Sequence, residues 1–295
     1  MISFTDAIEQ TLLEQDVPLV TDYDVFLTAW TLFEARQYQN TQIKRLPKDW
    51  DVVRSRGMIR KLVNRRTLAQ DQDFKSGVWR LVQSTRAADG AEAACIADPF
   101  CYVSHLSAMQ RFGLTERTPQ ELHLTRPART QWNSLRDAKV AREVPSRHEE
   151  EARSLLLHFG LGDALRRRPV TVHETKYPAK TTTVRGLKTR VAEVGATFID
   201  MLEAPHLCGG MQHVLDVWEA HAPDWLDRIM DAADAAPSGI VKVRAGYILS
   251  ERMGVTSTRI DAWRAFAQRG GSRKLDPSAD YRPVFSETWM ISLNV

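Results

Sequence analysis

The chain has 295 residues, of which 43% are hydrophobic and 26% are charged. These proportions are ordinary for a folded globular protein and exclude a disordered, collagen-like or mucin-like chain. No apolar run reaches the roughly 20 residues that span a membrane, and the N-terminus lacks the basic region of a secretory signal. We therefore expect a cytoplasmic protein of about two domains, with no membrane partner.

Three cysteines, an odd and sparse set, do not form a disulfide framework. Cys95, Cys101 and Cys208 make no CxxC pair and have no histidine at zinc-finger spacing. We predict that they are small buried hydrophobic side chains. The sequence predicts no metal site and no cofactor.

The charge is distributed unevenly along the first third of the chain. The net charge of the whole chain is only +3, but residues 1–43 carry a net charge of −6 and residues 44–86 carry +8. Basic residues gathered on one face are typical of proteins that bind polyanions. The alternative interpretation is a solvated helix with ordinary lysines and arginines.

The N-terminal elements follow from apolar spacing and capping residues. Phe4, Ile8 and Leu12 predict a helix over 3–14, and a short strand over 17–20 follows. A second helix is predicted from Thr21 or Asp22 to about Gln37. Residues 37–47 are predicted to be a loop, and residues 49–65 a third, basic helix.

The third helix has an apolar and a basic side at 100° per residue. The apolar side is predicted to hold Val52, Ile59 and Val63. The opposite side is predicted to hold Arg54, Met58, Lys61 and Arg65. In this register Arg56 falls near the apolar side.

Two extended segments follow the basic helix, with Leu68 starting the first and Val78 the second. The DFKSG turn between them has a glycine where positive φ is cheap, and Lys75 lies at its tip. Three helices followed by such a hairpin form the order of a winged helix-turn-helix. In that fold the third helix enters the major groove of DNA and the hairpin, or wing, touches the flanking backbone.

The residue types fit this role. Arginine pairs with guanine, asparagine pairs with adenine, and lysine and arginine neutralise phosphates. A winged helix that contacts only proteins is the alternative, and the positive helix face argues against it. The predicted DNA contacts are Arg54, Ser55, Arg56, Arg60, Lys61, Asn64, Arg65 and Lys75.

The rest of the chain changes character after a small, polar stretch at 83–94, which is predicted to be a linker. A helix over 104–112, ended by Gly113, precedes predicted strands at 121–125, 170–176 and 189–194. Helical patterns then follow at 197–205, 209–221, 224–234 and 241–254. The predicted fold class is α+β, with a winged-helix domain at 1–86 and, at 87–295, a mixed domain with strands first and a helical C-terminal half.

A second basic region covers residues 123–190, where fifteen Lys and Arg face seven Asp and Glu. It is either a surface for nucleic acid or a solvated rim, and the sequence leaves both interpretations open. The residues of this second basic surface are Arg166, Arg167, Arg168, Lys176, Lys180 and Lys188.

No catalytic constellation is visible, so we predict that the chain is not an enzyme. It has no phosphate-binding GxxxxGK[ST] loop, no HExxH and no GxSxG. Ser104, His105 and Ser107 lie close together, but a hydrolase also needs an acid that orients the histidine. The stretch GSRKLDPSAD is similar to the Gly-Ser start of a nucleotidyltransferase, yet it lacks the D-x-D pair.

Four motifs in order resemble the AbiEi-type antitoxins and transcriptional regulators. CYVSHLSAMQRFGLTERTP resembles their signature Y-hydrophobic-S-H-L-S-A…G-L-T…P, and RVAEVGATFIDMLEAPHLCGGMQHVL resembles their D-M-L…P…G-G helix pair. VRAGYILSERMG looks like their R-h-G-Y-h-L…G helix, where h is a hydrophobic residue, and GGSRKLDP with FSETWMISLN looks like a tail of one branch. The likeness runs from the predicted winged helix to the C-terminus, although the stretch at 20–40 is longer than in the commonest short form.

The resemblance implies a function. Such proteins are the antitoxin half of bacterial type IV toxin–antitoxin pairs, whose toxin is a nucleotidyltransferase often tied to phage defence. The antitoxin represses its own operon at inverted repeats of double-stranded DNA, and its C-terminal domain counters the toxin, functionally and without a stable complex. The alternative is a protein-interaction module that neutralises the toxin by direct binding.

Overall fold

The computed structural model describes residues 1–144, 146–158, 160–268 and 273–295. The fold is mixed α+β, and the C-terminal half is helical, as predicted. Contacts within the chain group it into two compact units. Unit 1 comprises residues 1–102, 126–176 and 183–190, and unit 2 comprises 103–125, 177–182 and 191–295. Within the described residues, no helix has both the length and the apolar character needed to cross a membrane.

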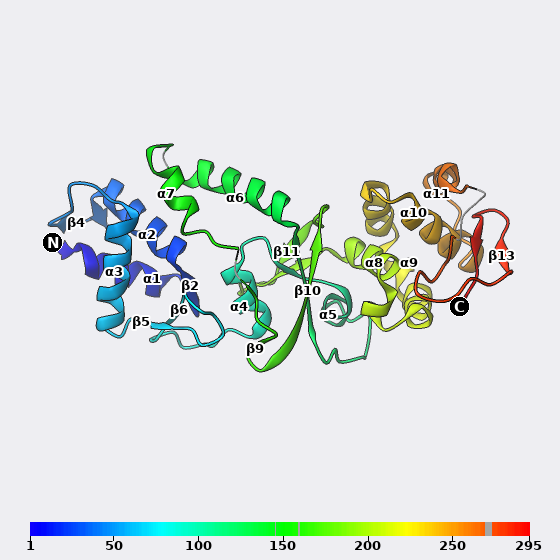
Figure 1. The fold of residues 1–295 in the computed structure, drawn as a ribbon, viewed down its shortest axis with the longest axis horizontal. Helices are drawn as coiled ribbons and strands as arrows, with labels where there is room; N and C mark the ends of the chain where they lie inside the picture. Colours follow the sequence, from blue (N-terminus) through cyan, green and yellow to red (C-terminus); the bar gives the residue numbers. More distant parts are fainter. Residues whose placement is uncertain (145, 159, 269–272) are drawn as a thin grey trace. The chain divides into compact units, whose positions relative to one another are not determined.

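Unit 1 begins with three helices and two small sheets (Figure 1). The elements up to residue 81 are β1 Ile2–Ser3, α1 Phe4–Glu14, β2 Leu19–Thr21, α2 Asp22–Ala35, β3 Gln37–Tyr38, β4 Thr41–Lys44, α3 Val52–Asn64, β5 Leu68–Gln70 and β6 Val78–Leu81. One sheet has the order β2-β6-β5, with both pairs antiparallel, and the other has the order β1-β4-β3. The three helices contact one another, so their apolar faces share one core.

Capping residues fix the start of the helices. Ser3 caps α1 and Asp51 caps α3, because each side chain accepts the backbone N–H of the residue three positions later. Thr21 and Asp24 form a reciprocal capping box at the start of α2. These caps place all three helices within a few residues of their predicted bounds.

Two N-terminal predictions are wrong. The predicted loop at 37–47 contains the β3–β4 hairpin, whose two turn residues, Gln39 and Asn40, have φ of 42° and 64°. A two-residue turn with positive φ matches the twist of paired strands. The predicted linker at 83–94 ends in helix α4, Gly90–Ala97, because Asp89 caps it by accepting the Glu92 N–H at 2.7 Å.

Later segments complete unit 1. They include helices α6 Arg129–Glu143 and α7 Glu149–Arg153, the 3-10 turn η1 Ser146–His148, and strands β9 Ala164–Leu165 and β10 Arg168–Thr175. Trp132 of α6 is buried in the same core as the N-terminal helices. At the end of α6, Glu143 accepts the hydroxyl of Tyr23 at 3.2 Å. The sequence analysis predicted no helix at the position of α6.

Strands β7 Tyr102–Val103, β8 Leu122–Pro127, β11 Thr181–Thr183 and β12 Arg190–Ala192 belong to a six-stranded sheet. The order of that sheet is β11-β12-β7-β8-β10-β9. Val103 and Val191 pair in parallel, and β9 pairs with β10 in an antiparallel hairpin.

Unit 2 is mainly helical (Figure 1). Its other elements are α5 His105–Arg111, α8 Val194–Glu203, η2 Pro205–Cys208, α9 Met211–Ala235, α10 Gly239–Gly246, the π-helix η3 Tyr247–Arg252, α11 Thr258–Trp263, η4 Arg264–Phe266, β13 Phe285–Ser286 and β14 Ile291–Ser292. The helices predicted at 209–221 and 224–234 are one element, α9, with Pro223 inside it and a kink at Trp225. All three cysteines of the chain are buried, as predicted.

Candidate nucleic-acid interface

Helix α3 buries a different face from the one its sequence predicted. Val52, Ile59 and Leu62 are buried, but so are Ser55 and Met58, while Val63 is only half-buried. The true apolar face is therefore rotated toward Met58. Met58 was predicted on the basic side, and this prediction is wrong. Ser55 was predicted to contact DNA, but it is fully buried and cannot reach a groove from this helix.

The exposed face of α3 is a stripe of residues three and four apart. Its centre holds Val53, Gly57, Arg60 and Asn64, and Arg56 and Lys61 flank it. Val53 is 74% exposed, which is unusual for a large apolar side chain on a helix that buries its other face. A Cβ built on Gly57 meets nothing within 4 Å, so the middle of the stripe is open.

The cations of this stripe are not neutralised by neighbours. Within the part of the chain that the structure describes, Arg56, Arg60 and Lys61 form no ion pair. Three exposed positive charges on one helix face attract a polyanion, whose condensed counterions they can replace. The sequence placed Arg56 near the apolar side, whereas the structure places it on the exposed one.

Two other predicted contacts are engaged within unit 1. Arg54 pairs with Asp51, the residue that caps α3. Arg65 lies at the end of α3 and donates to Asp6 at 2.6 Å and to Glu9 at 3.0 Å. The hydrogen bonds to Asp6 and Glu9 raise the pKa of Arg65. These two arginines therefore bind helix ends of the protein itself.

The loop between β5 and β6, residues 71–77, is held by short-range contacts. The amide of Gln70 donates to the carbonyls of Phe74 and Val78 at 3.1 and 3.2 Å, and Phe74 is buried. Gly77 has φ of 75°, as the turn motif predicted. Lys75 remains exposed in this loop.

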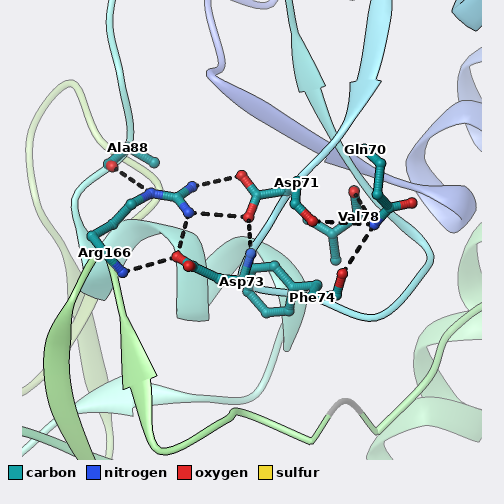
Figure 2. A network of polar contacts seen from close by, with 7 residues as sticks. All are labelled: Gln70, Asp71, Asp73, Phe74, Val78, Ala88 and Arg166. Atoms are coloured by element: carbon teal, nitrogen blue, oxygen red, sulfur yellow. Dashed lines mark hydrogen bonds and ion pairs between the residues drawn. The ribbon is translucent and has the colours of Figure 1, made fainter.

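Arg166 reaches the same loop from the turn between β9 and β10 (Figure 2). Its guanidinium forms a two-pronged ion pair with Asp71, at 3.0 and 2.8 Å, and also binds Asp73. Its backbone N–H donates to Asp73 at 2.8 Å, and its Nε donates to the carbonyl of Ala88 at 3.2 Å. Such bidentate pairs fix geometry as well as charge.

The second basic surface is therefore only partly free. Arg166 is engaged with the loop at 71–77 and is not available to a ligand. Arg167, Lys176 and Lys188 are exposed in unit 1, and Arg168 is half-buried. Lys180 is exposed and belongs to unit 2.

In unit 2, the Ser-His motif at the start of α5 forms a buried polar network. Ser104 Oγ lies 2.8 Å from His105 Nδ1 and accepts the Thr125 hydroxyl at 2.8 Å. The carboxylate of Asp200 accepts the backbone N–H of His105 at 3.5 Å, and burial raises the pKa of Asp200 to about 7. This contact supports the start of α5, where His105 has φ of 50°. Sequence reasoning missed Asp200.

The remaining features are three tryptophans of unit 2, the nucleotidyltransferase-like stretch and the possible metal ligands. Trp218 and Trp263 are buried, whereas Trp225 is 36% exposed at the kink of α9. Gly271 and Ser272, the Gly-Ser of the nucleotidyltransferase-like stretch, lie outside the described residues. No group of three or more His, Cys, Asp or Glu in the described ranges is arranged to hold a metal ion.

No protein-family model and no curated protein matches the chain. Among solved structures, it is similar to the crystal structure of the RV2827C protein from Mycobacterium tuberculosis, with a TM-score of 0.47 and 15% sequence identity. The similarity covers 98% of this chain and 90% of that one. A likeness at this level carries no argument about function, which is therefore inferred from the residues above.

Proposed function

We propose that residues 1–81 form a winged helix-turn-helix that binds double-stranded DNA. The order of elements supports this fold: α1, β2, α2 and α3 precede the β5–β6 hairpin, and β6 lies between β2 and β5 in one antiparallel sheet. The observation that carries the proposal is the exposed face of α3, where Arg56, Arg60 and Lys61 form no ion pair within the described residues.

In this proposal α3 lies in the major groove with its exposed stripe toward the bases. Arg60 donates to the O6 and N7 of a guanine, and Asn64 pairs with an adenine edge. The side chain of Val53 contacts the methyl group of a thymine, which explains why an apolar residue is 74% exposed there. Arg56 and Lys61, at the borders of the stripe, bind phosphates.

The biological role we propose is that of an antitoxin and autorepressor of a type IV toxin–antitoxin operon. The four sequence motifs support it, and all four lie wholly or almost wholly in unit 2. Two copies of the winged helix bind inverted half-sites, whose centres lie about 10 base pairs apart or a multiple of that. The region from residue 87 onward counters a nucleotidyltransferase toxin.

The test is a mobility-shift titration of the full chain with the DNA upstream of its own gene. An unrelated duplex of the same length and base composition is the control. Retention of the upstream duplex at protein concentrations at least about 1,000-fold below those needed for the control is the expected result, in line with ordinary specific binding. Equal retention of both duplexes would leave only a non-specific polyanion surface, and no retention would remove DNA binding altogether.

A second candidate function is direct neutralisation of a partner protein by unit 2. The observation that favours it is an apolar group near the C-terminus: Tyr281, Val284 and Phe285 are 53%, 58% and 51% exposed. Large apolar side chains that are exposed close together in the sequence favour a protein interface. Co-elution of the chain with its neighbouring toxin at high salt would favour this function, whereas association only in the presence of DNA would oppose it.

A further inference from the structure

We propose that the loop at 71–77 and the turn at 166–167 form one DNA-contacting lobe, which we call the double wing. Lys75 and Arg167 are its phosphate-binding residues, and Arg166 is the positioning residue that joins the two segments. The double wing rests on the proposed DNA-binding function and extends it, because a segment 85 residues beyond the end of β6 becomes part of the DNA interface.

The first observation is backbone strain at the turn. β9 and β10 pair through Arg168 and Leu165, so Arg166 and Arg167 are the two loop residues of the hairpin. Both have positive φ, 53° and 64°. Such turns strongly favour Asn-Gly or Gly-Gly, because other side chains meet a steric penalty in this region. Two arginines at strained positions point to a use for their side chains.

The use of Arg166 is visible in Figure 2, where its guanidinium joins Asp71, Asp73 and the carbonyl of Ala88. Asp71 is almost fully buried, so this pair is shielded from competing water. The backbone N–H of Arg166 also binds Asp73. The turn and the loop are thus held by main chain and side chain together, which fixes their relative position.

The second observation is electrostatic. The loop at 71–77 carries two carboxylates, which would repel a phosphate backbone beside Lys75. Arg166 binds both of them and offsets one of their two negative charges. The exposed cations that remain are Lys75 and Arg167, and within the described residues neither forms an ion pair. The ligand that fits two exposed cations on adjoining hairpins is the sugar–phosphate backbone that flanks the groove occupied by α3.

The variant Arg167→Asn tests the role of the exposed arginine. Asparagine tolerates positive φ, so the melting temperature should stay the same or rise. DNA binding should weaken by about 3- to 10-fold on specific and unrelated duplexes alike, and the slope of log K against log salt should fall by about 1. Arg167→Lys keeps the charge and should retain most of the affinity.

The matched control is Arg36→Asn. Arg36 is exposed in unit 1 and also has positive φ, 57°, but it caps the end of α2 away from the two loops in sequence. The Arg36→Asn substitution removes the same charge and should change the DNA affinity by no more than about twofold. A loss equal to that of Arg167→Asn would show a general charge effect and would overturn the double wing.

Asp73→Asn tests the positioning role of Arg166 with an opposite sign. Removal of a negative charge near DNA would tighten binding if charge alone mattered. The double wing predicts weaker binding, because the loss of the Arg166–Asp73 ion pair lets the turn and the loop move apart. It also predicts that adding Arg167→Asn to this variant weakens DNA binding little further. Tighter DNA binding by Asp73→Asn would refute the positioning role of Arg166. If the unmodified chain binds no DNA, both the proposed function and the double wing fail. If the unmodified chain binds DNA and Arg167→Asn has the same DNA affinity, only the double wing fails.

Discussion

The two units differ in the sign of their charge and in how they use their cations. Unit 1 holds 27 Lys and Arg against 21 Asp and Glu, whereas unit 2 holds 13 against 16. In unit 2, Arg259 binds Asp231 and Asp234, and Arg252 binds Glu219, so these two arginines join helices of that unit. On α3 of unit 1, Arg60 and Lys61 form no ion pair within the described residues.

The difference teaches that net charge alone does not mark a binding face. Arg54, Arg65 and Arg166 contribute to the positive charge of unit 1, yet each binds carboxylates of the same unit. Only cations without an internal partner gain a new interaction when a polyanion arrives, because paired ones must first lose an existing one. The comparison therefore predicts which substitutions change binding and which change stability.

The largest effect is expected from the double substitution of Arg60 and Lys61 by Glu. Two phosphate- or base-binding cations become repulsive charges, so DNA affinity should fall by at least about 100-fold. Both side chains are exposed, so circular dichroism and the melting temperature should be unchanged. The matched reversal of Arg259 in unit 2 should leave DNA binding intact. Retained binding by the α3 double mutant would disprove the interface.

An intermediate effect concerns pH and unit 2. Burial raises the pKa of Asp200 from 3.8 to about 7, so the folded state holds its proton where the unfolded chain has released it. This stabilising contribution is complete below about pH 4 and is lost as pH rises toward 7, at a cost of at most about 4 kcal/mol. Asp200→Asn removes the titration and keeps an acceptor for the His105 N–H.

The measurement is thermal unfolding of both chains from pH 4 to pH 8. The melting temperature of Asp200→Asn relative to that of the unmodified chain should rise with pH, and this difference should level off above about pH 7. A difference that stays constant with pH would contradict the raised pKa of Asp200. DNA binding by unit 1 serves as the control and should not change with this substitution.

The smallest effect is expected at Val53, through a single methyl group of the DNA. Replacing each thymine of the operator in turn by deoxyuridine removes only the 5-methyl group, and one such position should weaken binding about fourfold, from roughly 0.8 kcal/mol per buried methyl. In the Val53→Ala variant the same replacement should cost much less. Uniform insensitivity to deoxyuridine would remove Val53 from the base contacts.

The sequence predicted the three N-terminal helices of unit 1 well, because capping residues and apolar spacing together mark them. Thr21 and Asp51 stand directly before α2 and α3, and their side chains bind the first turn of each helix. The register of α3 was less predictable. Val52 and Val53 are adjacent, so only one can face the core, and the buried Ser55 and Met58 tip the balance toward a face that periodicity alone does not select.

Contacts between residues far apart in the chain could not be predicted from the sequence. Arg166 looked like part of a basic cluster, and its pairing with Asp71 joins residues 95 positions apart. A basic run does not reveal which of its members meet a carboxylate after folding. The β3–β4 hairpin and α6 were not predicted, because their polar sequences show neither the apolar spacing of a helix nor that of a strand. Tertiary packing of a few residues such as Ile43 and Trp132 stabilises them instead.

The most direct test of the central claim is the salt dependence of operator binding by the full chain. If Arg56, Lys61, Lys75 and Arg167 each bind a phosphate, log K should fall against log salt with a slope of about −4 per protomer. The operator should also remain preferred over an unrelated duplex throughout the titration. A slope near zero, or a slope equally steep for both duplexes without any preference, would contradict sequence-specific DNA binding by α3.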